Sequence, residues 1–381
     1  MKELVRKNVL NIKPYVAGKP IEETKRQLGL KEVIKLASNE NPLGPSPEAI
    51  SAMKKCLCGV NRYPDSQSYY LKKRLARYFG LDPANFALGN GSDELIDIII
   101  KTLVELDENI VISDTTFLEY EIIARVLERK VKKAPLRYFK YDLGAMLKLV
   151  DKKTKLIFIA NPNNPTGTYV TKNEVTEFLH ALPESIIVVF DEAYDAFIDV
   201  DDYPDSLSYF KRKKNIIILK TFSKAYGLAG LRLGYAIADA VLVTYMERVR
   251  QPFNVNILAQ AAALAAIEDK GFIKKTRRLV LEGKDFLYQS LSGMGLGFLP
   301  SVANFILVDA GKDGGEVFKF MLKFGVIVRD MQQYGLKNFI RVTIGTRKEN
   351  ERFVRVLKKV STPRAYVELR GCALVGREKN R

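Results

Sequence analysis

The stretch Ile216-Ile-Ile-Leu-Lys-Thr-Phe-Ser-Lys224 is an apolar run that ends in polar residues. Four other apolar runs end in the same way, at Asn90-Gly-Ser92, Ser113-Asp114, Asn161-Pro162 and Asp191-Glu192. Amphipathic helical patterns separate the runs, and such alternation is typical of a mainly parallel sheet that is covered by helices. Because ligands bind at the carboxyl ends of parallel strands, we expect the five polar segments to converge on one crevice.

Changes in the pattern of apolar, charged and proline residues along the chain predict a division into domains. The alternating pattern fills residues 46–268, which we expect to form a large α/β domain. Residues 1–45 are rich in proline and predict an irregular N-terminal arm with a segment that joins a smaller domain. Residues 269–362 combine a long charged helical pattern with short strands, so they predict a small α+β domain. Residues 363–381 have weak periodicity and predict a surface tail.

The composition excludes several classes of protein. With 381 residues and 47% hydrophobic content, the chain can bury a large core. It has no run of about 18 apolar residues, and its N-terminus lacks the apolar stretch of a signal peptide, so we expect no membrane association. A single His180 and the cysteines Cys56, Cys58 and Cys372 provide neither a disulfide framework nor a metal-ligand set. We therefore predict no metal site and a reducing, cytoplasmic location.

The formal net charge of +17 favours anionic ligands. A nucleic-acid-binding protein is the alternative that such a charge suggests. The lysines and arginines are scattered, however, and form no long basic arm with interleaved aromatic residues. We predict a basic surface without a dedicated nucleic-acid site.

Three of the polar segments carry groups with a chemical use. Gly89-Asn-Gly-Ser92 precedes a helical pattern, and free N–H groups at a helix start can hold a phosphate. Asp191 ends an apolar strand, where a charged carboxylate needs a cationic partner. Lys224 follows another such strand, where desolvation can make its amine a nucleophile. Each feature alone also fits an ordinary turn, a structural ion pair or a surface charge.

Together with Arg232, these features match the needs of pyridoxal phosphate (PLP). This cofactor requires a lysine for its aldehyde, an acid for its ring nitrogen and donors for its phosphate. The joint occurrence of all of them at strand ends favours a PLP site over three unrelated structural features.

At these residues the chain resembles the fold-type I PLP-dependent aminotransferases, and among them the histidinol-phosphate aminotransferases. The resemblance extends over about residues 14–359. It implies an α/β fold in which a mainly parallel seven-stranded sheet lies between helices, next to a smaller α+β domain. The motifs that carry it are Ala37-Ser-Asn-Glu-Asn-Pro-Leu-Gly44, Arg62-Tyr-Pro-Asp65, Gly89-Asn-Gly-Ser-Asp-Glu94, Asn161-Pro-Asn-Asn-Pro-Thr-Gly167, Asp191-Glu-Ala-Tyr194, Thr221-Phe-Ser-Lys-Ala-Tyr-Gly-Leu-Ala-Gly-Leu-Arg232, Arg250-Gln-Pro-Phe-Asn-Val-Asn256 and Arg341-Val-Thr-Ile-Gly-Thr346.

The resemblance implies a role for each cofactor-binding residue. Lys224 would carry PLP as a Schiff base and move the proton at the substrate α-carbon. Asp191 would keep the ring nitrogen protonated, while Tyr194 and Asn164 would hydrogen-bond the ring hydroxyl oxygen. The remaining implied contacts are Gly91, Ser92, Asp93, Thr221, Ser223 and Arg232 at the phosphate, with Phe117 stacked on the ring in place of the family's usual tyrosine.

Substrate contacts follow from the same resemblance. Arg341 would bind the substrate α-carboxylate, which a planar guanidinium suits. Tyr15 and Arg329 match positions that contact the phosphate of histidinol phosphate, and Asn39 is a further expected substrate contact. In the family, Tyr63 comes from the neighbouring subunit and reaches the cofactor phosphate. The resemblance therefore implies a homodimer with shared active sites.

The implied reaction is transamination between L-glutamate and imidazole-acetol phosphate, which gives 2-oxoglutarate and L-histidinol phosphate in histidine biosynthesis. Two related activities are the alternatives. An aromatic amino acid aminotransferase would accept phenylalanine and tyrosine, since their rings fill similar space to imidazole. A threonine-phosphate decarboxylase of cobalamin synthesis would share the lysine, the aspartate and a phosphorylated substrate. Tyr15 and Arg329 favour histidinol phosphate over the aromatic amino acids.

Overall fold

The computed structural model describes residues 2–213 and 215–360. The surface tail that we expect at residues 363–381 lies outside the described residues. Among the described residues, no helix combines the length and the apolar character that crossing a membrane requires.

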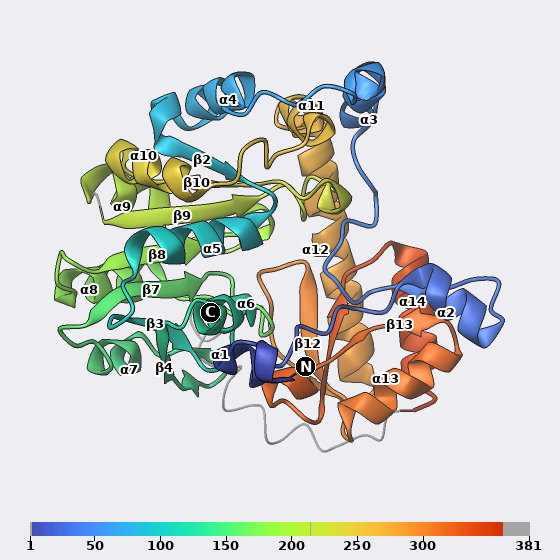
Figure 1. The fold of residues 1–381 in the computed structure, drawn as a ribbon. Helices are drawn as coiled ribbons and strands as arrows, with labels where there is room; N and C mark the ends of the chain where they lie inside the picture. The colour runs from blue at the N-terminus through green and yellow to red at the C-terminus, as the bar shows by residue number, and fades with distance from the viewer. Residues whose placement is uncertain (1, 214, 361–381) are drawn as a thin grey trace.

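A seven-stranded sheet forms the centre of the larger part of the molecule, in the order β2-β10-β9-β8-β7-β3-β4 (Figure 1). Its strands are β2 (Phe86–Gly89), β3 (Asn109–Ser113), β4 (Lys130–Ala134), β7 (Thr154–Ala160), β8 (Ile187–Asp191), β9 (Ile216–Thr221) and β10 (Gly234–Ile237). β4, β3, β7, β8 and β9 pair in parallel, whereas β10 is antiparallel to both β9 and β2. The prediction of a mainly parallel seven-stranded sheet is confirmed.

The connection from β9 to β10 explains the exception. It contains the short 3-10 helix Ala229–Leu231 and no α-helix, so the chain turns back beside β9 instead of crossing over the sheet. β10 therefore separates β2 from the four strands whose ends we expected to be neighbours. Because β2 is antiparallel to β10, it runs in the same direction as β9, and all five polar segments still lie at one edge of the sheet.

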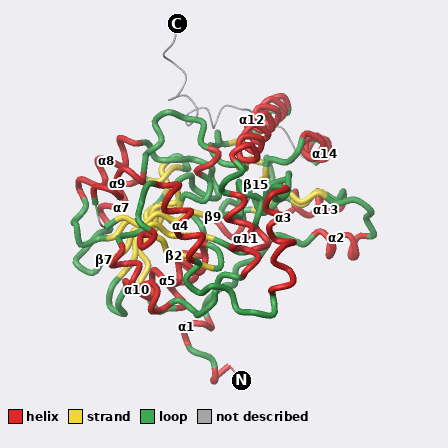
Figure 2. Tube along the Cα trace, turned by 90° about the horizontal axis from the view of Figure 1, so that it is seen from above, coloured by secondary structure: helices red, strands yellow, loops and turns green. Residues whose placement is uncertain are grey.

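Helices cover the strands on both sides, as the view from above shows (Figure 2). The helices of this part are α3 (Pro47–Cys56), α4 (Tyr69–Phe79), α5 (Ser92–Leu103), α6 (Glu119–Val126), α7 (Leu143–Lys148), α8 (Lys172–Ala181), α9 (Ser206–Arg212), α10 (Ala240–Val249) and α11 (Ile257–Ala266). Of these, α3 and α11 pack against each other beyond the sheet (Figure 1). Local capping defines their starts. At α8, for example, the Thr171 side chain accepts from the Glu174 N–H while the Glu174 carboxylate accepts from the Thr171 N–H.

The smaller part is built on a four-stranded antiparallel sheet, in the order β11-β12-β15-β14. Its strands are β11 (Gly297–Phe298), β12 (Phe305–Asp309), β14 (Arg329–Asp330) and β15 (Phe339–Thr343), and its helices are α12 (Lys270–Gly293), α13 (Gly314–Lys323) and α14 (Arg347–Leu357). The strands expected around residues 304–308 and 339–344 are thereby confirmed. A separate hairpin, β5 (Leu136–Arg137) with β6 (Lys140–Tyr141), lies on the larger part.

The N-terminal arm packs against this smaller part. β1 (Ile34–Lys35) pairs in parallel with β13 (Val326–Ile327), so the blue segment lies among orange elements in Figure 1. The expectation of an irregular arm is wrong at α2 (Ile21–Leu28), a helix that starts after Pro20 and ends at the left-handed Gly29. A shorter helix, α1 (Lys7–Leu10), precedes it.

Buried apolar side chains form two main clusters. The larger cluster runs from Ala49 to Ile267 and fills the space between the seven-stranded sheet and its helices. The second contains Leu36 and Tyr194 with residues from Val280 to Leu357 around the small sheet. Removing this much apolar surface from water is the main force that stabilises both parts. The clusters support a division near residues 45 and 268, which stays a prediction.

Candidate active site

A cavity of about 420 Å³ lies at the carboxyl ends of β7, β8 and β9 and at the start of α5. Residues from distant parts of the chain meet there, because both sheets and the N-terminal arm contribute to its wall. The predicted site residues that line it are Tyr15, Asn39, Ser92, Asp93, Phe117, Asn164, Asp191, Tyr194, Thr221, Ser223, Lys224, Arg232 and Arg341.

Asp191 is the last residue of β8 and lies between Ala160 of β7 and Leu219 of β9. Its carboxylate is buried and accepts hydrogen bonds from the Tyr120 hydroxyl at 2.5 Å and the Ala193 N–H at 3.1 Å. Burial raises the pKa of Asp191 to about 6, although both hydrogen bonds oppose the shift. Among the described residues it forms no ion pair, so its need for a cationic partner is unmet within the chain.

Lys224 faces the same cavity, and its Nζ donates to the Ser38 carbonyl oxygen at 3.1 Å. Burial lowers the pKa of Lys224 to about 8, and the nearby Arg341 cation adds to this effect. In a substantial fraction of molecules, the Lys224 side chain is therefore a neutral amine near pH 8.

Lys220, four residues earlier, has the opposite environment. Its Nζ forms ion pairs with Glu192, at 2.7 Å, and with Asp195. Burial disfavours the charged form, but attraction to Asp195 and Glu192 outweighs this and raises the pKa of Lys220 well above its usual value. Lys224 is thus the lysine whose amine is available for chemistry.

The anion-binding end of the cavity lies where α5 begins. Gly91 is the N-cap of this helix and has a φ of 86°, which favours glycine. A Cβ at Gly91 would lie 2.5 Å from Arg232 Nη2, so the missing side chain allows the guanidinium to approach the helix start. The same Nη2 donates to the Asp93 carboxylate at 2.7 Å. Helix N–H groups and a guanidinium together suit a phosphate.

Thr221 and Ser223 complete this end of the cavity. The Thr221 hydroxyl accepts from the Ser223 N–H at 3.0 Å, which forms a tight turn immediately after β9. The turn brings both side chains and Lys224 to the same wall. The structure therefore joins the expected phosphate contacts with the expected Schiff-base lysine.

Arg341 approaches the cavity from β15 of the small sheet. It is buried, its Nη1 donates to the Asn164 side-chain oxygen, and its Nη2 donates to the Ala37 carbonyl at 2.8 Å. Within the described residues its Nε is buried and has no hydrogen-bond partner. A buried guanidinium with an unused donor is suited to a carboxylate ligand.

Tyr194 and Asn39 form a second polar pair on the wall. The Asn39 amide donates to the Tyr194 hydroxyl at 2.9 Å, and both residues are buried. Burial raises the pKa of Tyr194, so the hydroxyl stays neutral and can donate a hydrogen bond. Asn164, the expected partner of Tyr194 at the ring hydroxyl, lines the same cavity and accepts from Arg341 Nη1.

Tyr120 is a site residue that the sequence reasoning missed. It is fully buried, it holds Asp191 through its hydroxyl, and its ring packs edge-on against Phe117 at 5.6 Å between centroids. No helical pattern reveals the pair, because α6 begins at Glu119 and Phe117 lies before its N-cap, Leu118. Glu119 also lines the cavity, and burial followed by the nearby Asp93 raises its pKa.

Three predicted residues are not part of the cavity wall: Gly91, which lies beside Arg232 at the start of α5, Arg329 and Tyr63. The Arg329 guanidinium stacks over the Tyr15 ring at 5.2 Å and is buried behind it, with its Nη2 donating to Gln333. Tyr63 is 81% exposed and stacks on Phe253 at 4.6 Å between centroids. It is not among the residues that line the cavity of its own chain.

The described residues contain no group of three or more His, Cys, Asp or Glu side chains placed to hold a metal ion. The groups that gather at the cavity are instead an amine, a buried acid, an anion-binding helix start and a guanidinium. Such a set can bind a phosphorylated ring with a basic nitrogen, form a covalent bond through Lys224 and hold a substrate carboxylate.

Curated relatives are similar over nearly the whole chain. A histidinol-phosphate aminotransferase from Moorella thermoacetica is 48% identical over 356 residues, which cover 93% of this chain and 92% of the relative. Histidinol-phosphate aminotransferase 2 from Carboxydothermus hydrogenoformans is 45% identical over 358 residues, 94% of this chain and 99% of the relative.

A solved structure and a family description agree with these similarities. The histidinol-phosphate aminotransferase from Sinorhizobium meliloti, crystallised in complex with pyridoxal-5'-phosphate, superposes with a TM-score of 0.85 at 28% identity and covers 94% of this chain and 97% of its own. The family described as aminotransferase class I and II matches residues 31–357. The chain therefore belongs to the class I and II aminotransferases, with the fold-type I architecture.

Proposed function

We propose that this chain is a PLP-dependent histidinol-phosphate aminotransferase that exchanges an amino group between L-glutamate and imidazole-acetol phosphate in histidine biosynthesis. The observation that carries the proposal is the placement of Lys224, Asp191 and an anion-binding helix start around one cavity. The names of relatives at 45–48% identity over almost the full chain support the choice of substrate.

The residues present fit PLP. Asp191 is a buried acid without a cationic partner among the described residues, and a pyridinium nitrogen would provide one. Because Gly91 has no side chain, the Arg232 guanidinium lies beside the start of α5, and a phosphate would accept from the guanidinium and from the helix N–H groups. Lys224 offers an amine with a lowered pKa for the aldehyde. When bound, PLP supplies the electron sink that weakens the bonds at the substrate α-carbon.

The chain contributes proton transfer and orientation. Lys224 Nζ, with a pKa of about 8, can take the proton from the substrate α-carbon and return it. Asp191, held by Tyr120, would stabilise positive charge at the ring nitrogen. The hydroxyl of Tyr194, kept neutral by burial, would donate to the ring oxygen.

Arg341 selects amino acids by their carboxylate. Its unused Nε would form a charge-assisted hydrogen bond with the α-carboxylate of L-glutamate. Imidazole-acetol phosphate has no α-carboxylate and cannot make this contact. For the phosphorylated substrate, the same guanidinium would hold the phosphate, with Tyr15 and the Arg329 behind it as further anion contacts. One basic region would thus serve both substrates.

A homodimer in the cytoplasm is part of the proposal. Tyr63 is exposed and lies away from its own cavity, so a neighbouring subunit is needed for it to reach a cofactor phosphate. The free cysteines Cys56 and Cys58 suit a reducing compartment.

Lys224→Ala tests the cofactor assignment. The variant should lose transamination by at least about 1,000-fold, because it removes both the cofactor attachment and the proton-transfer group. Borohydride reduction of the wild-type holoenzyme, followed by peptide mass spectrometry, should place the pyridoxyl label on Lys224. Lys275→Ala, at an exposed position on α12, is the control and should retain activity. A label on Lys220, or full activity in Lys224→Ala, would refute the assignment.

Arg329→Ala tests the substrate. If Arg329 attracts the substrate phosphate, KM for histidinol phosphate should rise by about tenfold or more, while kcat/KM for phenylalanine should change little. Arg278→Ala, an exposed arginine, is the matched control. Equal losses with both substrates would contradict a phosphate contact, and carbon dioxide release from threonine phosphate would favour the decarboxylase instead.

A further inference from the structure

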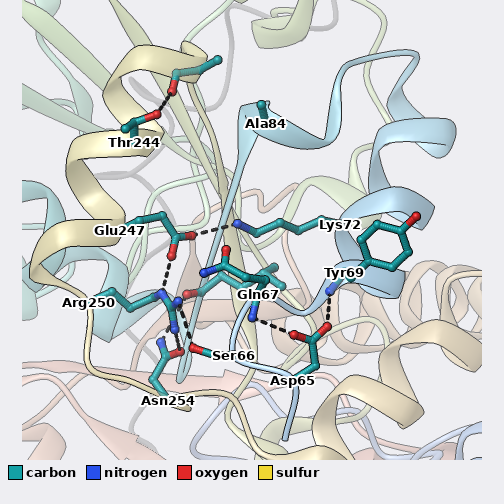
Figure 3. Close-up of polar contacts among 12 residues, drawn as sticks. Asp65, Ser66, Gln67, Tyr69, Lys72, Ala84, Thr244, Glu247, Arg250 and Asn254 are labelled. Atoms are coloured by element: carbon teal, nitrogen blue, oxygen red, sulfur yellow. Dashed lines mark hydrogen bonds and ion pairs between the residues drawn. The ribbon is translucent and has the colours of Figure 1, made fainter.

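Arg250 lies outside the cavity, at the C-terminal end of α10, in a polar network that the proposed chemistry does not use (Figure 3). Its side chain is only 7% exposed. Nε donates to Glu247 at 2.7 Å, and Nη1 donates to the Asn254 side-chain oxygen at 2.7 Å. Nη2 reaches the Ser66 hydroxyl at 3.4 Å. A buried guanidinium with this many partners fixes the geometry of the groups around it.

The contact with Asn254 sets the orientation of that amide. Because Arg250 has donors and no acceptor, it holds the amide oxygen of Asn254 toward itself. The Asn254 Nδ2 consequently faces the other way and donates to the Leu88 carbonyl at 3.2 Å and to Glu94 Oε2 at 2.6 Å. The network therefore passes from α10 to the end of β2 and the first turn of α5.

Glu94 carries the network to the anion-binding helix start. Its Oε2 also accepts from the Asn90 N–H at 2.5 Å. Asn90 immediately precedes Gly91, the N-cap of α5, and the next residue, Ser92, lines the cavity. One carboxylate oxygen thus joins Asn254 to the loop that would hold the cofactor phosphate.

The other side of the network is anchored on α4. Glu247 accepts from Arg250 through one oxygen and from Lys72 Nζ, at 2.8 Å, through the other. Lys72 and Glu247 are 13% and 19% exposed, so water screens this pair less than a surface ion pair. Two basic and two acidic side chains, Arg250, Lys72, Glu247 and Glu94, balance in charge around Asn254. Such a network favours one arrangement of its members.

We propose that Arg250 is a positioning residue for the phosphate-binding loop Asn90–Ser92, acting through Asn254 and Glu94. This inference rests on the proposed function, since it assigns the loop to the PLP phosphate. It predicts that the network contributes to the recognition of the phosphate group and not to that of the pyridine ring.

The test compares PLP with pyridoxal, which lacks the phosphate. Dissociation constants of both would be measured by absorbance titration of cofactor-free wild-type protein, Arg250→Lys and Asn254→Ala. Lysine retains the charge but cannot hold Asn254, Glu247 and Ser66 together. Both variants should lower the preference for PLP over pyridoxal by about tenfold, because a misplaced loop loses charge-assisted bonds to phosphate. Arg248→Lys, on the same helix and exposed, is the matched control and should keep the preference.

The outcomes separate the inference from a general loss of structure. Equal weakening of PLP and pyridoxal, or a wild-type preference in both variants, would overturn the positioning role. If Arg250→Lys does not fold, as judged by circular dichroism, Asn254→Ala decides, because it leaves every charge of the network in place. Failure of the wild-type protein to bind PLP at all would overturn the proposed function itself, a result that the variants cannot mimic.

Discussion

Adjacent residues at the end of β8 have opposite roles because strand side chains alternate between the two faces of a sheet. Asp191 faces the cavity, whereas Glu192 pairs with Lys220 away from it. The ion pairs of Lys220 hold its proton, while Lys224, beyond the strand, is left with a lowered pKa. Alternation thus separates the two acids, whereas the two lysines differ because Lys220 lies within β9 and Lys224 lies beyond its end.

Asp191→Asn should separate the catalytic role of this acid from its cost to the fold. Without a carboxylate at the ring nitrogen, transamination should fall by about 100- to 1,000-fold. In the cofactor-free protein, the raised pKa of about 6 means that the folded state binds the Asp191 proton more tightly than the unfolded state. Wild-type stability should therefore drop as pH rises from about 4 through 6, by up to about 3 kcal/mol, and the variant should lack this component.

Urea unfolding of the cofactor-free proteins at several pH values checks this expectation. Asp285→Asn, at an exposed position on α12, provides the control and should retain the wild-type pH dependence. If the free energy of unfolding of wild type and of Asp191→Asn changes with pH in parallel, the pKa of Asp191 is not raised in the cofactor-free protein.

At the scale of elements, the main strands and the polar residues at their ends could be predicted from the sequence. Five apolar runs with polar ends predicted a mainly parallel sheet and the edge where Asp191 and Lys224 meet, because strands that are buried on both faces are apolar throughout. The number of seven strands followed from the family resemblance. The helix α2 was missed because its apolar stripe is short and lies among prolines. Tyr120 was missed because no sequence pattern distinguishes a tyrosine whose buried hydroxyl donates a hydrogen bond from any other apolar residue of an amphipathic helix.

The stacking of Arg329 on Tyr15 could not be predicted from local sequence patterns either. Tyr15 lies in the arm and Arg329 on β14, and their stacking depends on how the arm packs on the small sheet. A motif supplies residue types at positions along the chain, whereas packing across more than 300 positions depends on tertiary contacts.

Gly91→Ala tests the loop between β2 and α5 as an element. The new Cβ would lie 2.5 Å from Arg232 Nη2, and alanine is strained at a φ of 86°. Arg232 is a flexible side chain and should move away, so the dissociation constant for PLP should rise by about tenfold or more while the protein still folds.

Gly293→Ala is the matched control, because a Cβ there meets nothing within 4 Å. Its affinity for PLP should equal that of the wild type when both are titrated under the same conditions. An unchanged affinity in Gly91→Ala would mean that the phosphate does not depend on Arg232 lying beside the start of α5.

At the scale of the whole molecule, the cavity is a joint product of three regions. The large sheet and the turn after β9 bring Asp191 and Lys224, the small sheet brings Arg341, and the arm brings Tyr15. Tyr63 is the exception, since it is exposed on a surface that also presents Phe253. If Tyr63 serves the neighbouring subunit, each site needs Lys224 from one chain and Tyr63 from the other.

Mixed dimers test this arrangement. Lys224→Ala and Tyr63→Ala would each be weakly active alone, because every site in either homodimer carries the lesion. In a dimer with one chain of each kind, one site carries both lesions and the other carries neither. After the two variants are unfolded and refolded together in equal amounts, activity should recover to roughly a quarter of the wild-type value, since half of the dimers are mixed and half of their sites are intact. Refolding of each variant alone is the control. Activity that stays at the level of the separate variants would place Tyr63 and Lys224 at the same chain's site, whereas full activity of Tyr63→Ala alone would mean that Tyr63 serves no site.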